Sequence, residues 1–270
     1  MQPSQIDEAA ALISQHWKDG TRMPLIPARC RPESRADGFA VQAAAARLLC
    51  QSTLGWKIAA SSVAGQRHIG VDGPLAGRLL AQQVLTAGAN EANRIGLQNN
   101  ILRVAEPEFV FRMARPLPRR DVMRNPYSED EVMHAVDGLH LAIEIPDTRL
   151  SDYVNAGAAS LIADFACAAW WVVGPAVTAT WREIDLSRHA VTANKNGREV
   201  ATGSGANVLG DPRIALTWIA NELATHESGL QAGDYVTTGT SVVPVPIEPG
   251  DTVMMDFGVL GCISAGFTPN

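Results

Sequence analysis

Three glutamates in apolar segments are the residues whose types and spacing most directly suggest chemistry. Glu106 and Glu108 stand two positions apart in VAEPEFVF, and Glu144 lies inside LHLAIEI. Alternate side chains of an extended segment leave the same face, so the first two carboxylates point the same way. Converging buried anions are costly unless a cation lies between them. Three carboxylates without a paired His or Cys favour Mg²⁺ or Mn²⁺ over zinc.

The same spacing has a second interpretation. Each glutamate could lie on an outward strand face, where water solvates the carboxylate and no metal is needed. The spacing alone supports the two interpretations about equally.

Lys57 is a second charge among apolar neighbours, in the segment GWKIAAS. A lysine there could hold a substrate carboxylate, or transfer protons with a lowered pKa. The alternative is an outward strand residue whose stem packs on Trp56. Asp147 and Arg149 follow in EIPDTRL. They are expected to form a structural ion pair or to orient the carboxylate of a ligand.

Three further segments are candidates for polar groups that could bind or react with a ligand. Thr238, Gly239 and Thr240 in TTGTSVV could hold a substrate carboxylate or enolate through hydroxyls and amides, or could simply form a tight turn. His68 precedes a glycine-rich turn, where it could act as a base, and neither it nor the other histidines have metal-ligand spacing. The segment GSGANVLGDP precedes a helix signal but matches neither a P-loop nor a dinucleotide fingerprint.

Helix signals frame these candidates. Apolar residues at spacings of three and four predict a helix over 4–18, with Ser4 as N-cap and Gly20 beyond its end. An alanine-rich helix is expected over 39–50. Ser128 and Glu131 form a capping-box pattern ahead of a short helix. Asp211 followed by proline supplies the N-cap of a further helix.

Short apolar segments divided by Gly and Pro follow from Trp56 onward. We expect strands at 55–61, 106–113, 139–145, 170–174, 176–181, 198–203, 235–240, 252–257 and 260–267. Asn196-Gly197 is the pair that a type I′ hairpin turn prefers. Many short strands indicate a mainly antiparallel sandwich or barrel rather than alternating βαβ units.

Composition excludes several classes of protein. The chain has 270 residues, 22 Lys and Arg against 28 Asp and Glu, and a net charge of −6, so nucleic acid and anionic membrane surfaces are not expected partners. The longest apolar run, 165–173, is too short to cross a bilayer. The N-terminal residues lack a signal-peptide pattern. The four cysteines form no C-x-x-C pair, and Cys167 and Cys262 are expected to behave as small hydrophobes. A reducing cytoplasm fits best.

Together these motifs resemble one family. The segments GWKIAAS, GVDGP, AEPEFVFRMARPL, LAIEIPDTR, GSGANVLGDPRIALTWIANEL, LQAGDYVTTGT and VPVPIEPGDTVMMDFGVLGCISAGF are similar to the 2-oxopent-4-enoate hydratase and 4-oxalocrotonate decarboxylase branch of the fumarylacetoacetate hydrolase superfamily. The resemblance extends from about Trp56 to the C-terminus and more loosely covers the N-terminal helices.

The resemblance implies an α+β fold: a mainly antiparallel β-roll core with N-terminal and peripheral helices. Residues 1–54 would form a helical segment packed on the core, and 55–270 a metal-binding catalytic domain. Mg²⁺ or Mn²⁺ would be held by Glu106, Glu108 and Glu144. Lys57 would contact a 2-oxo or 2-hydroxy-enoate substrate, and Thr240 or its amide its carboxylate. The resemblance also implies a cytoplasmic homo-oligomer that degrades products of aromatic-ring cleavage.

Two departures bear on the reaction. The hydratases usually carry an Asp after the GVD-x-P turn, where this chain has Leu75. Their Asp-Asn-x-Ser segment, a substrate-binding element that includes Asp164, is here Asp164-Phe165-Ala166-Cys167. A metal-dependent hydratase remains the leading expectation. The alternatives are a C–C hydrolase of an acylpyruvate such as maleylpyruvate or fumarylpyruvate, a 2-oxo-enedioate decarboxylase, and, least favoured, a partner subunit without activity.

Overall fold

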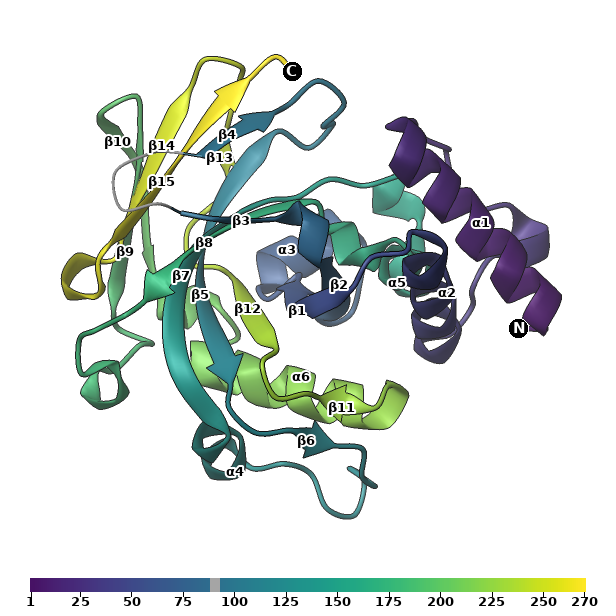
Figure 1. Cartoon of the computed structure of the whole chain (residues 1–270), viewed down its shortest axis with the longest axis horizontal. Helices are drawn as coiled ribbons and strands as arrows, with labels where there is room; N and C mark the ends of the chain where they lie inside the picture. Colours follow the sequence, from purple (N-terminus) through teal and green to yellow (C-terminus); the bar gives the residue numbers. More distant parts are fainter. Residues whose placement is uncertain (88–92) are drawn as a thin grey trace.

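Six α-helices accompany the β-sheets in a computed structural model, which describes residues 1–87 and 93–270 (Figure 1). Among these residues no helix is long and apolar enough to span a membrane. The helices are α1 (Pro3–Asp19), α2 (Arg35–Leu48), α3 (Val63–His68), α4 (Glu129–His134), α5 (Gly157–Ala163) and α6 (Pro212–His226).

The larger sheet holds the strands that carry the candidate residues. Its order is β2-β1-β12-β5-β7-β8-β3, and β13 also pairs with β5. Only three residues, 81–83, separate β2 at one edge from β3 at the other, so the sheet is rolled (Figure 1). The strands are β1 (Thr53–Ala59), β2 (Leu75–Leu80), β3 (Val84–Thr86), β5 (Val104–Met113), β7 (Val136–Ile145), β8 (Trp170–Ala176), β12 (Tyr235–Thr240) and β13 (Val245–Pro246).

A second sheet covers one side of the roll, in the order β10-β9-β14-β15-β4. Asn196 and Gly197 join β9 to β10 with positive φ angles of 53° and 77°, as the sequence predicts for a type I′ turn. A small pair, β6 (Leu117–Pro118) and β11 (Gly229–Leu230), lies beside α6. The second sheet contains β4 (Asn93–Gly96), β9 (Ala190–Lys195), β10 (Arg198–Ser204), β14 (Thr252–Asp256) and β15 (Cys262–Thr268).

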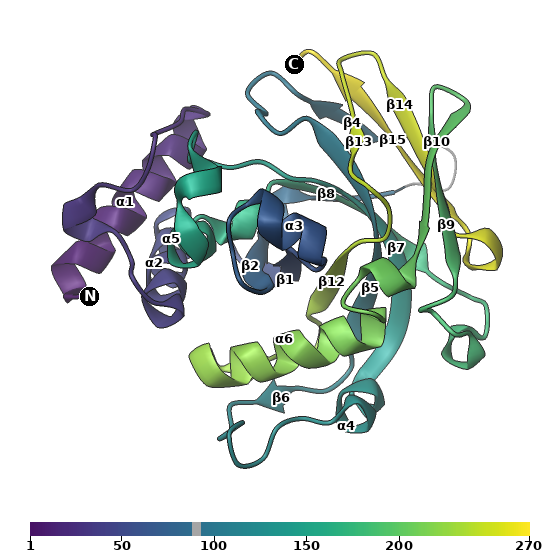
Figure 2. The same cartoon turned by 180° about the vertical axis from the view of Figure 1, so that it is seen from behind.

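The two faces of the rolled sheet pack differently. On β5 and β7, alternate residues such as Phe109, Phe111 and Leu141 join the main hydrophobic core. The opposite face carries a separate small cluster of Leu79, Val110, Ala142, Trp171 and Val173. Strand periodicity places the candidate glutamates on the face of this small cluster. Figure 2 shows α1, α2 and α5 gathered away from the second sheet.

The α+β class with a mainly antiparallel β core is confirmed, as are the capping box at Ser128 and the N-cap at Asp211. Three local predictions are wrong. The first helix begins at Pro3 with Gln2, not Ser4, as N-cap, because proline at N1 already fixes a helical φ. The segment after Ala176 is not a strand. Cys262 is exposed rather than buried. The short helices α3 and α5 have no strong periodicity and were not expected.

Candidate metal centre

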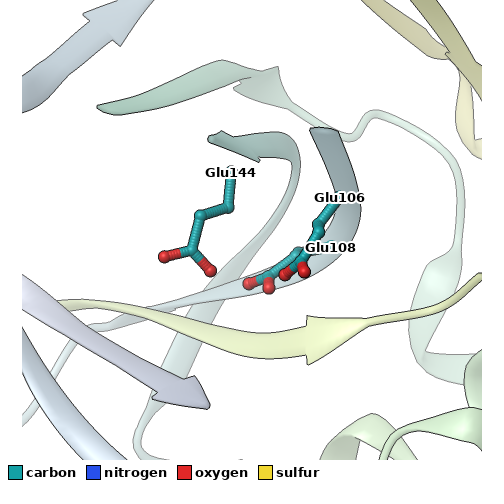
Figure 3. A group of neighbouring side chains, drawn as sticks. All are labelled: Glu106, Glu108 and Glu144. Atoms are coloured by element: carbon teal, nitrogen blue, oxygen red, sulfur yellow. The ribbon is translucent and has the colours of Figure 1, made fainter. Parts of the chain in front are cut away.

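The three glutamates converge from two neighbouring strands. Glu106 and Glu108 lie two residues apart on β5, and Glu144 lies on β7. The antiparallel register pairs Glu106 with Glu144 and Glu108 with Ala142. One carboxylate oxygen from each glutamate lies within 4.8 Å of those of the other two. Figure 3 shows the two carboxylates from β5 side by side and that of Glu144 facing them. The geometry therefore favours the inward interpretation of the sequence pattern over the solvated one.

Burial makes this cluster unfavourable as three free anions. Glu108 and Glu144 are 0% and 1% exposed. Burial, with repulsion from Glu144, raises the pKa of Glu106 to about 7 and that of Glu108 well above its usual range, although Lys57 opposes both. Burial also raises the pKa of Glu144 against the effect of Lys57. Without a cation the cluster therefore retains protons near neutral pH, and a metal must displace them.

Lys57 lies against the carboxylates from β1. Its Nζ is 3.1 Å from Glu144 Oε1 and donates a hydrogen bond of 3.1 Å to the carbonyl of Ala166. Burial alone would lower the pKa of Lys57, but the attraction of Glu144, Glu108 and Glu106 outweighs it, so the pKa is raised. In the metal-free protein the carboxylates therefore favour the protonated form of Lys57 over the lowered pKa that the sequence pattern allowed.

Thr237 is a site residue that the sequence reasoning missed. Its Oγ1 donates a hydrogen bond to Glu108 Oε2 from β12, and the residue is fully buried. Its strand neighbours Thr238 and Thr240 were singled out, but no sequence signal identified Thr237, because its place beside Lys57 depends on the register of two distant strands. Thr237 fixes the orientation of one metal-site carboxylate.

The two threonines that the sequence singled out, Thr238 and Thr240, have different surroundings. Thr238 donates a hydrogen bond of 3.0 Å to the carbonyl of Phe109 and stabilises the sheet. Thr240 pairs in register with Glu108, so it lies at the site, and its Oγ1 donates to the carbonyl of Val242 at 2.8 Å. Its role in binding a substrate carboxylate stays a prediction.

Asp147 and Arg149 do not pair with each other; each has another partner. Asp147 forms an ion pair with Arg22 and accepts a hydrogen bond of 3.0 Å from the amide of Ile101. Burial raises the pKa of Asp147, although Arg149 and Arg22 oppose the shift. Arg149 Nε lies 2.5 Å from Asp164 Oδ1, and both residues are buried. Because the two side chains bind each other, they have few groups left to contact a substrate directly. The pair instead stabilises the backbone around the site.

His68 is exposed to solvent, whereas Leu75 is buried beside the site. His68 is exposed at the end of α3, its ring centroid 6.2 Å from that of Tyr153, and among the described residues it is not part of the carboxylate cluster. Its position therefore does not support the expected role as a base. Leu75 is fully buried on β2 and pairs with Ala59, on the same face as the neighbouring Lys57–Gly77 pair. The position of the hydratase-type Asp is thus apolar.

The donor set fits a hard divalent cation. Glu108 Oε1 and Glu144 Oε2 are buried without a hydrogen-bond partner in the part of the chain that the structure describes. Buried carboxylate oxygens are normally satisfied, so a missing ligand is the simplest account of these two. Oxygen-only donors suit Mg²⁺ or Mn²⁺. Glu106, Glu108 and Glu144 are the residues that could hold the ion.

Sequence comparison defines the class of protein. Residues 95–268 match the family model described as fumarylacetoacetate (FAA) hydrolase C-terminal, and the chain belongs to this family. The matched region contains all three glutamates.

Individual relatives indicate which members of the family the chain is similar to. The chain is 29% identical to a 2-keto-4-pentenoate hydratase of Paraburkholderia xenovorans, covering 100% of this chain and 97% of the relative. It is 32% identical to a 4-oxalocrotonate decarboxylase of Pseudomonas putida, over 51% of each chain. The solved 4-oxalocrotonate decarboxylase from Pseudomonas putida G7, complexed with magnesium and adipate, superposes with a TM-score of 0.86 at 24% identity, covering 99% of this chain and 98% of that one. The resemblance found in the sequence is confirmed.

Proposed function

We propose that this chain is a divalent-metal-dependent hydratase acting on a 2-hydroxydienoate or 2-oxo-enoate of the 2-oxopent-4-enoate type, in the degradation of aromatic compounds. The observation that carries the proposal is the buried cluster of three carboxylates beside Lys57. The full-length likeness to the 2-keto-4-pentenoate hydratase supports the reaction type.

Glu106, Glu108 and Glu144 would hold Mg²⁺ or Mn²⁺. The ion supplies Lewis-acid stabilisation of negative charge on the oxygens of a 2-oxo acid. Thr237 prepares the site by occupying Glu108 Oε2, which leaves Glu108 Oε1 free to bind. A preorganised ligand of this kind loses little freedom when the metal binds.

Lys57 supplies a second cationic group beside the carboxylates. Its Nζ lies 3.1 Å from Glu144 Oε1, and the attraction of the three carboxylates raises its pKa. It can donate a hydrogen bond to, and stabilise, the anion that forms when a 2-hydroxydienoate is converted to its keto form. Burial strengthens this electrostatic effect because water does not screen it.

Decarboxylation of a 2-oxo-enedioate is the second candidate. It is favoured by the 32% identity to a 4-oxalocrotonate decarboxylase over 51% of each chain. Hydrolysis of an acylpyruvate uses the same stabilised anion and is the remaining alternative. These reactions have different products.

A product assay separates the candidates. With Mg²⁺ present, we would offer 2-hydroxypenta-2,4-dienoate, a 2-oxo-enedioate and maleylpyruvate separately and follow each by NMR. A 4-hydroxy-2-oxo acid from the dienoate supports the proposal, release of CO₂ supports the decarboxylase, and pyruvate with a dicarboxylic acid supports the hydrolase. The variant Glu106→Gln should lose turnover, whereas the exposed Glu199→Gln on β10 should retain it.

We further propose that the protein is a cytoplasmic homo-oligomer. The support is the family resemblance together with four free cysteines, of which Cys50 and Cys262 are exposed. Light scattering coupled to size-exclusion chromatography measures the mass directly. A mass of 28.8 kDa, that of one chain, would contradict the oligomer.

A further inference from the structure

A left-handed turn beside the site is the most unusual stretch of backbone in the described chain. Phe165, Ala166 and Cys167 have φ angles of 57°, 50° and 63°, and none of them is glycine. Residues with a side chain rarely adopt this conformation, and they keep it only where the surroundings impose it. Strain of this kind concentrates at functional sites, so the contacts that impose it are informative.

Arg149 and Asp164 hold both ends of this turn. Arg149 donates through Nη2 to the carbonyl of Asp164 at 2.8 Å and through Nη1 to that of Ala168 at 3.1 Å. The Asp164 carboxylate receives Arg149 Nε at 2.5 Å and the Arg149 amide at 2.8 Å. The two side chains therefore fix where the turn begins and where it ends.

Gly77 lets the turn approach the sheet. A Cβ atom at this position would lie 1.9 Å from the carbonyl oxygen of Phe165. Gly77 also pairs in register with Lys57. The turn is thus pressed against the strand pair that carries the lysine.

Trp17 covers the turn from α1. Its ring lies 5.1 Å from that of Phe165 in an edge-on arrangement, and Arg149 Cζ lies 4.2 Å from its centroid. The tryptophan thereby contacts both the first residue of the turn and the guanidinium that brackets it. Cation–π and aromatic contacts of this kind favour one defined geometry.

The turn has one direct consequence at the site. It aims the carbonyl of Ala166 at Lys57 Nζ, 3.1 Å away, while Glu144 Oε1 lies 3.1 Å from the same nitrogen. We propose that Trp17 is a positioning residue that acts through Arg149 and the turn 165–167 to fix the Lys57 ammonium. This inference rests on the proposed function for its kinetic consequence, and it gives the N-terminal helix a role in catalysis beyond packing.

Four variants of the full-length protein test it: Trp17→Ala, the conservative Trp17→Phe, Lys57→Met, and the double variant of Trp17→Ala with Lys57→Met. Ile13→Ala serves as the matched control, because Ile13 lies one turn earlier on α1 and is fully buried. Kinetics are measured with the dienoate and Mg²⁺. On the metal-free protein, hydrogen exchange reports on 164–168, and the rate of reductive methylation of Lys57, read by mass spectrometry, reports on how firmly its amine is held.

We expect Trp17→Ala to lower kcat by about 10- to 100-fold with KM changed little, since small misplacement of a catalytic group has effects of this size. Hydrogen exchange at 164–168 and methylation of Lys57 should both rise. Trp17→Phe should keep kcat, hydrogen exchange and methylation close to those of the unmodified protein. Ile13→Ala should lower the free energy of unfolding by an amount comparable to Trp17→Ala but should leave kcat, exchange and methylation unchanged. In the Lys57→Met background the tryptophan substitution should add no further loss of kcat.

Additive losses in the double variant, or equal losses in Ile13→Ala, would overturn the inference. Unchanged methylation of Lys57 in Trp17→Ala would overturn it independently of turnover. If the unmodified protein turns over none of the offered acids, the proposed function fails, while the exchange and methylation results still decide whether Trp17 positions the lysine.

Discussion

Glu106 and Glu144 lie directly opposite each other on neighbouring antiparallel strands. Like charges in that relationship destabilise a sheet. Here a third carboxylate, Glu108, makes the repulsion worse, and among residues 1–87 and 93–270 Lys57 is the cation that forms an ion pair with the cluster. An arrangement that weakens the metal-free fold but presents three oxygen donors is expected of a cation site, where binding energy replaces the missing stability.

The metal-free protein should therefore lose stability as pH rises. Burial raises the pKa of Glu106 to about 7 from its ordinary 4.5. Between these values the folded state binds more protons than the unfolded state, so the free energy of unfolding falls as pH increases. Thermal unfolding of EDTA-treated protein from pH 5 to 8 measures this. Glu106→Gln, which cannot ionise, should show a flatter dependence than the unmodified protein.

Mg²⁺ should reverse this effect. The ion competes with protons for the carboxylates, so the rise in Tm on adding Mg²⁺ should be larger at pH 8 than at pH 6. An equal rise at both pH values, or an equal rise in Glu106→Gln, would show that the ion binds elsewhere.

Removing the charge of Lys57 should separate metal binding from turnover. Lys57→Met deletes a cation that repels the incoming ion, so the affinity for Mn²⁺, measured by EPR, should be unchanged or higher. Turnover should fall by about 100-fold or more, the size seen when an electrostatic stabiliser is lost. Lys57→Arg, which keeps the charge with a different shape, should bind Mn²⁺ like the unmodified protein. A parallel loss of affinity and turnover would mean that Lys57 only supports the fold.

Much of the site could be predicted from local sequence, because strand periodicity is a local property. The two-residue spacing of Glu106 and Glu108, and the charges inside otherwise apolar strands, singled out the three glutamates and Lys57 as candidates, and the family resemblance favoured the metal site over solvated carboxylates. The type I′ turn at Asn196-Gly197 was predictable for the same reason, since two adjacent residues determine it.

The supporting contacts could not be predicted, because they depend on tertiary packing. Nothing near Arg149 in the sequence shows that its partner is Asp164 rather than Asp147. The left-handed turn at Phe165 contacts distant elements, with Trp17 packed on its first ring and Gly77 leaving room for its carbonyl, while local propensity argues against it. His68 shows the converse limit of local sequence: its residue type beside a glycine-rich turn suggested a base, yet it is exposed and lies outside the carboxylate cluster of the described residues.

Gly77 offers a direct test of the close approach between β2 and the turn. In Gly77→Ala the new Cβ would lie 1.9 Å from a backbone oxygen, which no side-chain rotation can relieve. We expect a loss of about 2–3 kcal/mol in the free energy of unfolding, measured by urea denaturation. Gly73→Ala is the matched control, because nothing lies within 4 Å of the Cβ position there. Similar stabilities of the two variants would contradict the packing described.

Asp164 should contribute to stability through the turn rather than through substrate contact. Asp164→Asn keeps the size of the side chain but removes the charge that pairs with buried Arg149, and breaking a buried pair costs about 3–5 kcal/mol. The free energy of unfolding should fall by that order, while KM for the dienoate, measured on the fraction that remains folded, should change little. A large rise in KM with unchanged stability would instead restore Asp164 to the substrate-binding residues that the sequence motif implied. The two outcomes differ because a residue whose oxygens are already engaged by Arg149 and Thr148 has few acceptors left for a ligand.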